Sequence, residues 1–368
     1  MADLKLMERL SNAFGPGGFE EEVARIAGEH GREFEVTMDA MNNVYLALKG
    51  NRGDRPVIML DAHLDEVGFM VQSIDAKGLI SMVPLGGWIS TNIPAHRMII
   101  RNRRGELIRA VVVSKPPHFM TPEEKENGRI HMESLRLDIG STSRQEVLEL
   151  FGIAPGDPVV PDVAFEYSER NGIMLGKAFD NRIGCLAVIE TLKKLSGLDL
   201  PFDVVGALAA QEEVGTRGAA VTAQVVKPDF AIVFEGSPAD DVYYDEFTAQ
   251  GALKKGVQIR HLDQSYVSHP GFIRFAEGLA KEKKISYQSA VRRGGGTNAG
   301  RIHLSGKSVP VLVLGIPSRY VHTHYSYAAL SDVDAAISLA VETVKAMDGD
   351  VADELLRKKY LSSGGEDA

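Results

Sequence analysis

The chain has 368 residues, of which 44% are hydrophobic and 25% are charged, with a formal net charge of −9. This length is too great for one small domain and fits two, and the acidic balance argues against nucleic acid or an anionic membrane surface as the main partner. The single Cys185 excludes an internal disulfide and a cysteine-based zinc cluster. Because no apolar run approaches the ~20 residues of a membrane span and the N-terminus lacks a signal-peptide core, we expect a cytoplasmic protein.

The first part of the chain alternates helices and strands. Apolar periodicity predicts helices at residues 4–13 and 19–32, then a strand at 43–48. From residue 180 to 347 the chain returns to helices and long apolar strands, a pattern typical of a mixed sheet covered by helices. These two parts together predict an α/β domain.

The segment between them has a different texture. Short alternating strands are separated by turns rich in glycine, proline and arginine, and one short helix at 143–151 interrupts them. The charged, proline-containing stretch 116–133 is predicted to be a mobile loop. We therefore expect one domain formed by residues 1–67 and 167–361, a small β-rich domain inserted at 68–166, and a disordered tail at 362–368.

A histidine stands at the end of the first buried strand. His63 is followed two residues later by Asp65, and this spacing in an extended chain places both side chains on one face. His63 could therefore bind a metal while Asp65 accepts the other ring N–H and fixes the tautomer. A structural histidine at a strand end is the commoner explanation for such a pair on its own.

Three more candidate ligands stand beside predicted strands. Asp180 opens a helix predicted to run to residue 195, and a simple N-cap is its more ordinary explanation. Glu235 follows the strand predicted at 229–234, and His322 follows the strand at 310–314. In open α/β sheets, sites form at the carboxyl ends of strands.

Two adjacent carboxylates, Glu212 and Glu213, follow the buried strand predicted at 204–208. Such a pair is costly there unless something positive meets it, and adjacent side chains point in different directions. One carboxylate can bind a metal while its neighbour reaches the water on that metal, which is the division that hydrolytic sites need. A solvated pair that opens a loop explains these two residues equally well when they are taken alone.

Together these residues give the chain a recognisable likeness. It resembles the M42 family of dinuclear-metal aminopeptidases, which includes glutamyl aminopeptidases and tetrahedral TET peptidases, along nearly its whole length. The resemblance implies a mixed-sheet α/β catalytic domain covered by helices, zinc-exopeptidase-like, with a small β-rich domain inserted after the first metal-binding histidine. The markers are Phe14-Gly15-Pro16-Gly17-Gly18-Phe19-Glu20, Ala62-His63-Leu64-Asp65-Glu66-Val67-Gly68, Phe179-Asp180-Asn181-Arg182, Glu212-Glu213-Val214-Gly215-Thr216-Arg217-Gly218-Ala219 and Arg319-Tyr320-Val321-His322.

The resemblance implies two divalent metal ions per chain. Asp180 would bridge them, His63 and Glu235 would complete one site, and Glu213 and His322 would complete the other. Imidazole and carboxylate ligands suit zinc or cobalt, and manganese less well. The family usually has Asp where this chain has Glu235, so one methylene must be accommodated.

The resemblance also implies the catalytic roles. Glu212 would be the general base and acid, acting on a metal-bridging water, and Asp65 would be the partner that orients His63. A cis peptide bond would follow Asp180. The family tends to have Glu at the position of Ser326, and we interpret the nearby His324 as a surface residue without a ligand role.

These expectations define a metal-dependent aminopeptidase that trims short peptides and assembles into a homododecamer built from dimers. Two alternatives remain open: a dinuclear hydrolase of another amide, such as an acyl-amino acid, and a peptide-binding assembly protein with a decayed site. The family has a similar glycine-rich turn close to its active site, so the turn at 294–298 is expected to shape the substrate pocket. Arg292 and Arg293 beside it either favour an acidic first residue or form a solvated face.

Overall fold

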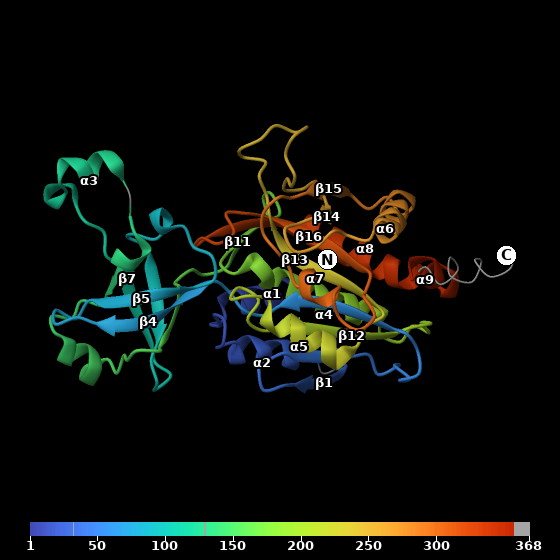
Figure 1. Cartoon of the computed structure of the whole chain (residues 1–368), viewed down its shortest axis with the longest axis horizontal. Helices are drawn as coiled ribbons and strands as arrows, with labels where there is room; N and C mark the ends of the chain where they lie inside the picture. Colours follow the sequence, from blue (N-terminus) through green and yellow to red (C-terminus); the bar gives the residue numbers. More distant parts are fainter. Residues whose placement is uncertain (32, 129, 357–368) are drawn as a thin grey trace, which may run out of the picture.

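The computed structural model describes residues 1–31, 33–128 and 130–356, and Figure 1 shows that they form two lobes. The larger lobe is built on a mixed sheet, and the smaller lobe on a closed barrel. Within these ranges, no helix combines the length and the apolar character that crossing a membrane requires. The predicted tail at 362–368 and the predicted helix end at Arg32 lie outside the described residues.

The sheet of the larger lobe is formed by β1 (Glu35–Met38), β2 (Val44–Ala47), β3 (Val57–His63), β10 (Glu166–Ser168), β11 (Ile173–Gly176), β12 (Asp203–Ala209), β13 (Phe230–Pro238), β14 (Val257–Leu262), β15 (Tyr287–Val291), β16 (Val311–Arg319) and β17 (Ser326–Ala329). Its strand order is β1-β2-β12-β3-β13-β16-β17-β11-β10, with β14 pairing to β16 and β15 to β14. The central strands β12, β3, β13 and β16 are parallel. Both faces of a parallel sheet are covered, which explains their nearly continuous apolar sequences.

Helices cover both faces of this sheet. They are α1 (Leu4–Asn12), α2 (Glu21–His30), α4 (Phe179–Leu195), α5 (Arg217–Val226), α6 (Pro270–Glu282), α7 (Ala299–Ile302), α8 (Leu330–Ala346) and α9 (Gly349–Leu355). The central helix α4 packs against β3 and β13 on one side and against α1 and α8 on the other. Its apolar run is therefore buried nearly all round. On the opposite face, α5 and α7 pack a second, smaller core against β13 and β16.

The smaller lobe is a closed barrel of six strands among the described residues, in the order β4-β5-β8-β7-β6-β9. They are β4 (Gly68–Ile74), β5 (Ile80–Leu85), β6 (Arg97–Arg101), β7 (Leu107–Val112), β8 (Arg136–Asp138) and β9 (Pro158–Pro161). Closure comes from the pairing of β4 with β9, which brings Phe69 opposite Val159. The alternating apolar residues of these strands face inward and form a separate core.

Two local predictions for this lobe need correction. The stretch 116–133, predicted as a loop, contains the helix α3 (Pro122–Asn127) between the short 3₁₀ turns η2 (Pro117–Phe119) and η3 (Met132–Ser134). The helix predicted at 143–151 is mainly a π-helical turn, η4 (Glu146–Leu150). Pro122 is the first residue of α3, and a proline at a helix start fixes a favourable backbone angle.

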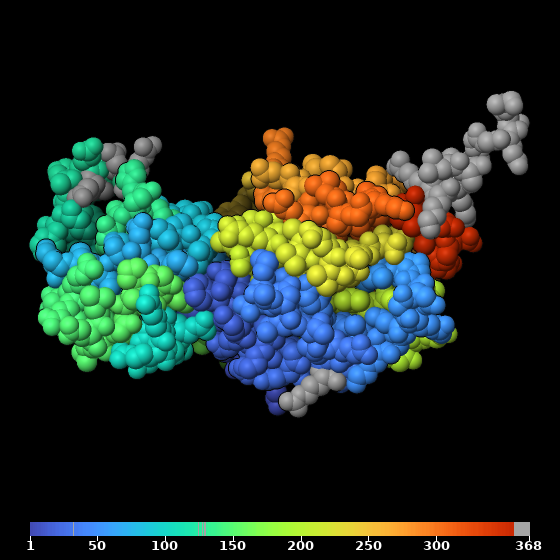
Figure 2. Space-filling model, turned by 60° about the horizontal axis from the view of Figure 1, so that its bottom comes forward, coloured from blue at the N-terminus to red at the C-terminus, as the bar shows by residue number. Residues whose placement is uncertain are grey.

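The lobes meet along the N-terminal segment and the segment after β16. Figure 2 shows the barrel lobe directly against the blue N-terminal part of the larger lobe, where the guanidinium of Arg101 lies 4.4 Å from the centre of the Phe14 ring. The prediction that His324 is a surface residue is wrong, because the barrel covers it. Its ring is 1% exposed and stacks on His96, with the ring centres 4.0 Å apart.

Candidate metal centre

The predicted ligands converge at the carboxyl edge of the parallel strands. His63 is the last residue of β3, Glu213 follows β12, and His322 follows β16. Asp180 lies at the start of α4. Glu235 was expected after its strand but lies inside β13, because the pairing of β13 with β16 continues as far as Pro238.

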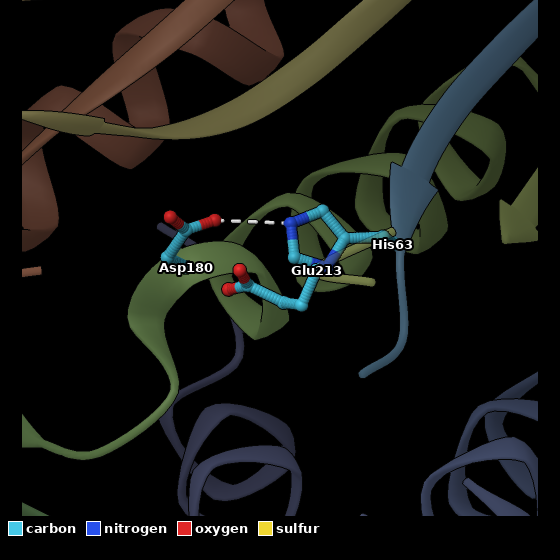
Figure 3. Close-up of side chains that lie close together, drawn as sticks. All are labelled: His63, Asp180 and Glu213. Carbon is cyan, nitrogen blue, oxygen red and sulfur yellow. Dashed lines mark hydrogen bonds and ion pairs between the residues drawn. The ribbon is translucent and has the colours of Figure 1, made fainter. Parts of the chain in front are cut away.

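The two carboxylate oxygens of Asp180 face two different histidines. Oδ1 lies 3.0 Å from Nε2 of His63, and Oδ2 lies 3.4 Å from Nε2 of His322. Glu235 Oε1 is 3.5 Å from the same His63 nitrogen, and Glu213 Oε2 is 3.4 Å from the same His322 nitrogen. Figure 3 shows the Asp180 carboxylate facing the ring of His63, with the Glu213 carboxylate on the same side of the ring as Asp180. The cluster thus has two halves that share Asp180.

The donor atoms fit divalent cations. One ligand atom each from His63, Asp180 and Glu213 lies within 4.8 Å of the others. Glu213 Oε1 and Glu235 Oε2 are fully buried and have no hydrogen-bond partner. Buried carboxylate oxygens without partners are costly unless a cation meets them. Two imidazoles and three carboxylates are a ligand set of the kind that zinc-type ions take.

Electrostatics give the same indication. Burial raises the pKa of Glu213, and burial together with the charge of Asp180 raises the pKa of Glu235 to about 8. Burial opposes protonation of His322, but its contacts with Asp180 and Glu213 raise its pKa to about 11. Bound protons thus offset the negative charge of the crowded carboxylates when no cation is bound. Ligands must lose such protons to bind a metal, so metal binding should release them.

Asp65 and the Asp180–Asn181 peptide hold residues of the cluster in position. Nδ1 of His63 lies 3.1 Å from the backbone oxygen of Asp65 and 3.4 Å from its Oδ1. The Asp65 carboxylate accepts the backbone N–H groups of Glu212 and Glu213 at 2.9 and 3.1 Å. The Asp180–Asn181 bond is cis, which confirms the expectation from the resemblance. The Asn181 side chain donates to the backbone oxygen of Phe234 at 2.8 Å.

Glu212 lies beside the cluster but outside its closest contacts. Its Oε2 is 3.9 Å from Nε2 of His63, farther than Asp180 or Glu235. Burial and the charge of Glu235 raise the pKa of Glu212 well above its ordinary value, although His63 opposes this. A carboxylate at this place, with its backbone fixed by Asp65, is suited to exchange a proton with a group held at the cluster.

The inserted barrel contributes a wall of the site. Gly86 has a φ of +90°, and a side chain there would come within 3.1 Å of Glu213; at Gly87 it would come within 3.0 Å of His322. Trp88 next to them stacks on Phe69, with ring centres 4.9 Å apart. Only glycine allows so close an approach of this turn to the cluster.

The cluster opens into a pocket of about 910 Å³. The predicted glycine-rich turn, Gly294 to Gly296, lines it, as do Arg292 and Arg293. Sequence analysis missed Arg260, which also lines the pocket and is 4% exposed. The available signal was an arginine between apolar residues of the strand at 257–262, Ile259 and Leu262 among them, because a buried cation needs a partner.

This mixed sheet, with its inserted barrel and its histidine–carboxylate cluster at the strand ends, is the architecture of a peptidase-type hydrolase. The family model described as M42 glutamyl aminopeptidase matches residues 42–339. The chain therefore belongs to the M42 peptidase family and is an aminopeptidase by membership.

Individual relatives agree along most of the chain. A glutamyl aminopeptidase of Lactococcus lactis subsp. cremoris is 32% identical over 299 residues, covering 81% of this chain and 83% of the relative. The structure of a TET aminopeptidase from the archaeon Thaumarchaeota archaeon SCGC AB-539-E09 is 37% identical, with a TM-score of 0.91, covering 96% of this chain and 99% of that one. The TET1 peptidase of Pyrococcus horikoshii is 25% identical, with a TM-score of 0.83 over 94% of this chain and 99% of that one.

Proposed function

We propose that the chain is a two-metal aminopeptidase that releases acidic N-terminal residues from short peptides. His63 and Glu235 would hold one divalent cation, Glu213 and His322 would hold the other, and Asp180 would serve both. Zinc or cobalt suits these ligands better than manganese. The observation that carries the proposal is the pair of Asp180 oxygens facing two separate histidines, at 3.0 and 3.4 Å.

The chain's own residues supply the proton transfer. Two cations in the cluster would polarise the scissile carbonyl and lower the pKa of a water that they hold. Glu212 takes a proton from the attacking water and passes it to the departing amine, because it lies beside the cluster but outside its closest contacts. Asp65 keeps Glu212 in place through the backbone N–H of Glu212 at 2.9 Å. Capture of the peptide's free amine beside the cluster would restrict cleavage to the first residue.

The preference for an acidic residue rests on two arginines in the pocket. Arg260 donates to Ser237 Oγ at 2.5 Å and to Asp263 at 3.3 Å, but its Nε has no partner. Arg292 donates to the backbone oxygen of Pro238, and its buried Nε also has no partner. Burial, and next the charge of Arg260, lower the pKa of Arg292. Both arginines line the pocket, so a carboxylate side chain there would meet their positive charge, and the name of the Lactococcus lactis relative supports this choice.

A panel of dipeptides and aminoacyl anilides with Glu, Asp, Lys and Leu at the first position tests the proposal. We expect the highest kcat/KM for the acidic substrates and no cleavage of their N-acetylated forms. Rapid cleavage of an N-acetylated substrate would favour the acyl-amide alternative instead. Equal rates for the Lys and Glu substrates would remove the assigned role of the two arginines.

Self-association is part of the proposal. The Pyrococcus horikoshii TET1 peptidase can assemble into a tetrahedron or a large octahedral shell. In this chain one loop beside the pocket exposes four apolar or aromatic side chains, Val242, Tyr243, Tyr244 and Phe247, and such clusters of exposed apolar groups mark interaction surfaces. We infer a homododecamer built from dimers, in which subunit packing limits substrate size to short peptides.

A further inference from the structure

A second buried carboxylate reaches the backbone of the catalytic pair from outside the metal centre. Glu20 immediately precedes α2, yet its side chain does not cap that helix and is 0% exposed. Its Oε1 accepts the backbone N–H groups of Gly18 and Gln211, at 2.8 and 3.1 Å. Gln211 directly precedes Glu212 and is 191 positions from Glu20 in sequence. The side chain of Glu20 therefore bonds to the chain just after β12 instead of capping its own helix.

Glu20 and Asp65 together hold three consecutive backbone N–H groups. Asp65 accepts those of Glu212 and Glu213 at 2.9 and 3.1 Å, and Glu20 accepts that of Gln211. Gln211 has a φ of +55°, a left-handed conformation that is uncommon for residues other than glycine. This turn sets the directions in which the two following side chains leave the backbone, so the bond to Gln211 controls their aim.

The segment that carries Glu20 is packed closely under the pair. A side-chain carbon added to Gly17 would lie 3.3 Å from Asp65 Oδ2 and 3.4 Å from Val214. Burial, and next the charge of Asp65, raise the pKa of Glu20 to about 7. A protonated carboxyl group still accepts a hydrogen bond through its carbonyl oxygen, so the bond to Gln211 does not require a charge on Glu20.

We propose that Glu20 is a positioning residue, which fixes the backbone of Gln211 and thereby aims the carboxylate of Glu212 at the reacting water. The proposal rests on the assignment of Glu212 as the general base. Glu20 itself touches neither substrate nor ligand. The positioning depends on where the Glu20 oxygen that accepts the Gln211 N–H lies, and not on the charge of the Glu20 carboxylate.

Two substitutions of Glu20 separate the effect of its side-chain length from the effect of its charge. Glu20→Asp keeps the charge but withdraws the oxygen by one methylene, whereas Glu20→Gln loses the charge and keeps the reach. In the metal-saturated enzyme, we expect Glu20→Asp to lower kcat by about 10- to 100-fold, the scale of a misplacement near 1 Å, with KM and metal content unchanged. Glu20→Gln should keep kcat within about threefold, so the amide should rescue what the shorter acid loses.

A control residue, Asp203, lies at the start of β12, the strand whose far end leads to Gln211. Asp203 is also buried and accepts two backbone N–H groups, from Arg52 at 2.8 Å and Gly53 at 2.6 Å. Asp203→Ala should lower the thermal midpoint without changing kcat of the folded enzyme. If Glu20→Asp fails to fold, Glu20→Gln decides alone, since a tenfold or larger loss of kcat in that variant contradicts the proposal.

The outcomes separate this inference from the proposed function. The positioning role is overturned if Glu20→Asp keeps full kcat, if Glu20→Gln is the more damaged variant, or if kcat falls only in step with metal content. Glu212→Gln is assayed in parallel. Full activity of that variant would contradict the proposed function itself, whereas its inactivity beside an unaffected Glu20→Asp would contradict the positioning role alone.

Discussion

Replacing Glu212 by Gln tests the division of labour within the carboxylate pair. The substitution keeps the shape of the side chain and the backbone bond to Asp65, and it removes only the capacity to take up a proton. Because Oε2 of Glu212 lies 3.9 Å from Nε2 of His63 while Asp180 lies at 3.0 Å, metal content should not change. The loss of a general base should lower kcat by roughly 10²–10⁴-fold, equivalent to about 2.7–5.4 kcal/mol in the activation free energy.

The assay compares Glu212→Gln with Glu213→Gln on a glutamyl anilide, with elemental analysis of both proteins. Glu213 Oε1 is buried without a partner, and its Oε2 is 3.4 Å from His322, so Glu213→Gln should weaken metal binding and regain activity when metal is added. If Glu212→Gln lost metal while Glu213→Gln kept metal and lost kcat, our assignment of the two residues would be reversed.

Three further outcomes are expected. Arg292→Met should lower kcat/KM for Glu substrates by roughly 10- to 100-fold and leave Leu substrates unchanged, because one charged hydrogen bond contributes about 1.5–3 kcal/mol; an equal loss for both substrates would contradict this. Lys177 lies 2.6 Å from the buried Glu66, so Lys177→Met should lower the free energy of unfolding by about 3–5 kcal/mol. As a control, Lys345→Met removes an exposed pair with Glu342 and should lower the free energy of unfolding by about 1 kcal/mol or less. Light scattering should give roughly 480 kDa, twelve times the 40.0 kDa chain mass, and a strict monomer would refute the assembly.

The candidate site could be located from the sequence because three of its residues, His63, Glu213 and His322, stand at or just after strand ends. The buried strands before His63 and Glu212 are long and apolar, and parallel strands bring their carboxyl ends to one edge. The same logic failed at Glu235, because pairing with β16 extends β13 beyond its apolar stretch. Sequence alone did not locate that strand end, since the last residues of β13, Gly236 to Pro238, carry no apolar signal.

Contacts between distant segments could not be predicted in this way. Glu20 was assigned to a helical pattern, and nothing near it in sequence indicates a bond to Gln211. His324 was interpreted as exposed because the covering group, His96, belongs to the inserted barrel. The β-rich character of that barrel follows from its alternating residues, but its closure depends on the pairing of Phe69 with Val159, which local periodicity does not encode.

Metal titration of chelator-treated protein, followed by glutamyl anilide turnover, tests the central claim most directly. Five proposed ligands, of which Asp180 is shared, predict saturation at two zinc or cobalt ions per chain, no activity before metal is added, and release of protons on binding. Saturation at one ion per chain, or full turnover by the metal-free protein, would contradict the two-metal account.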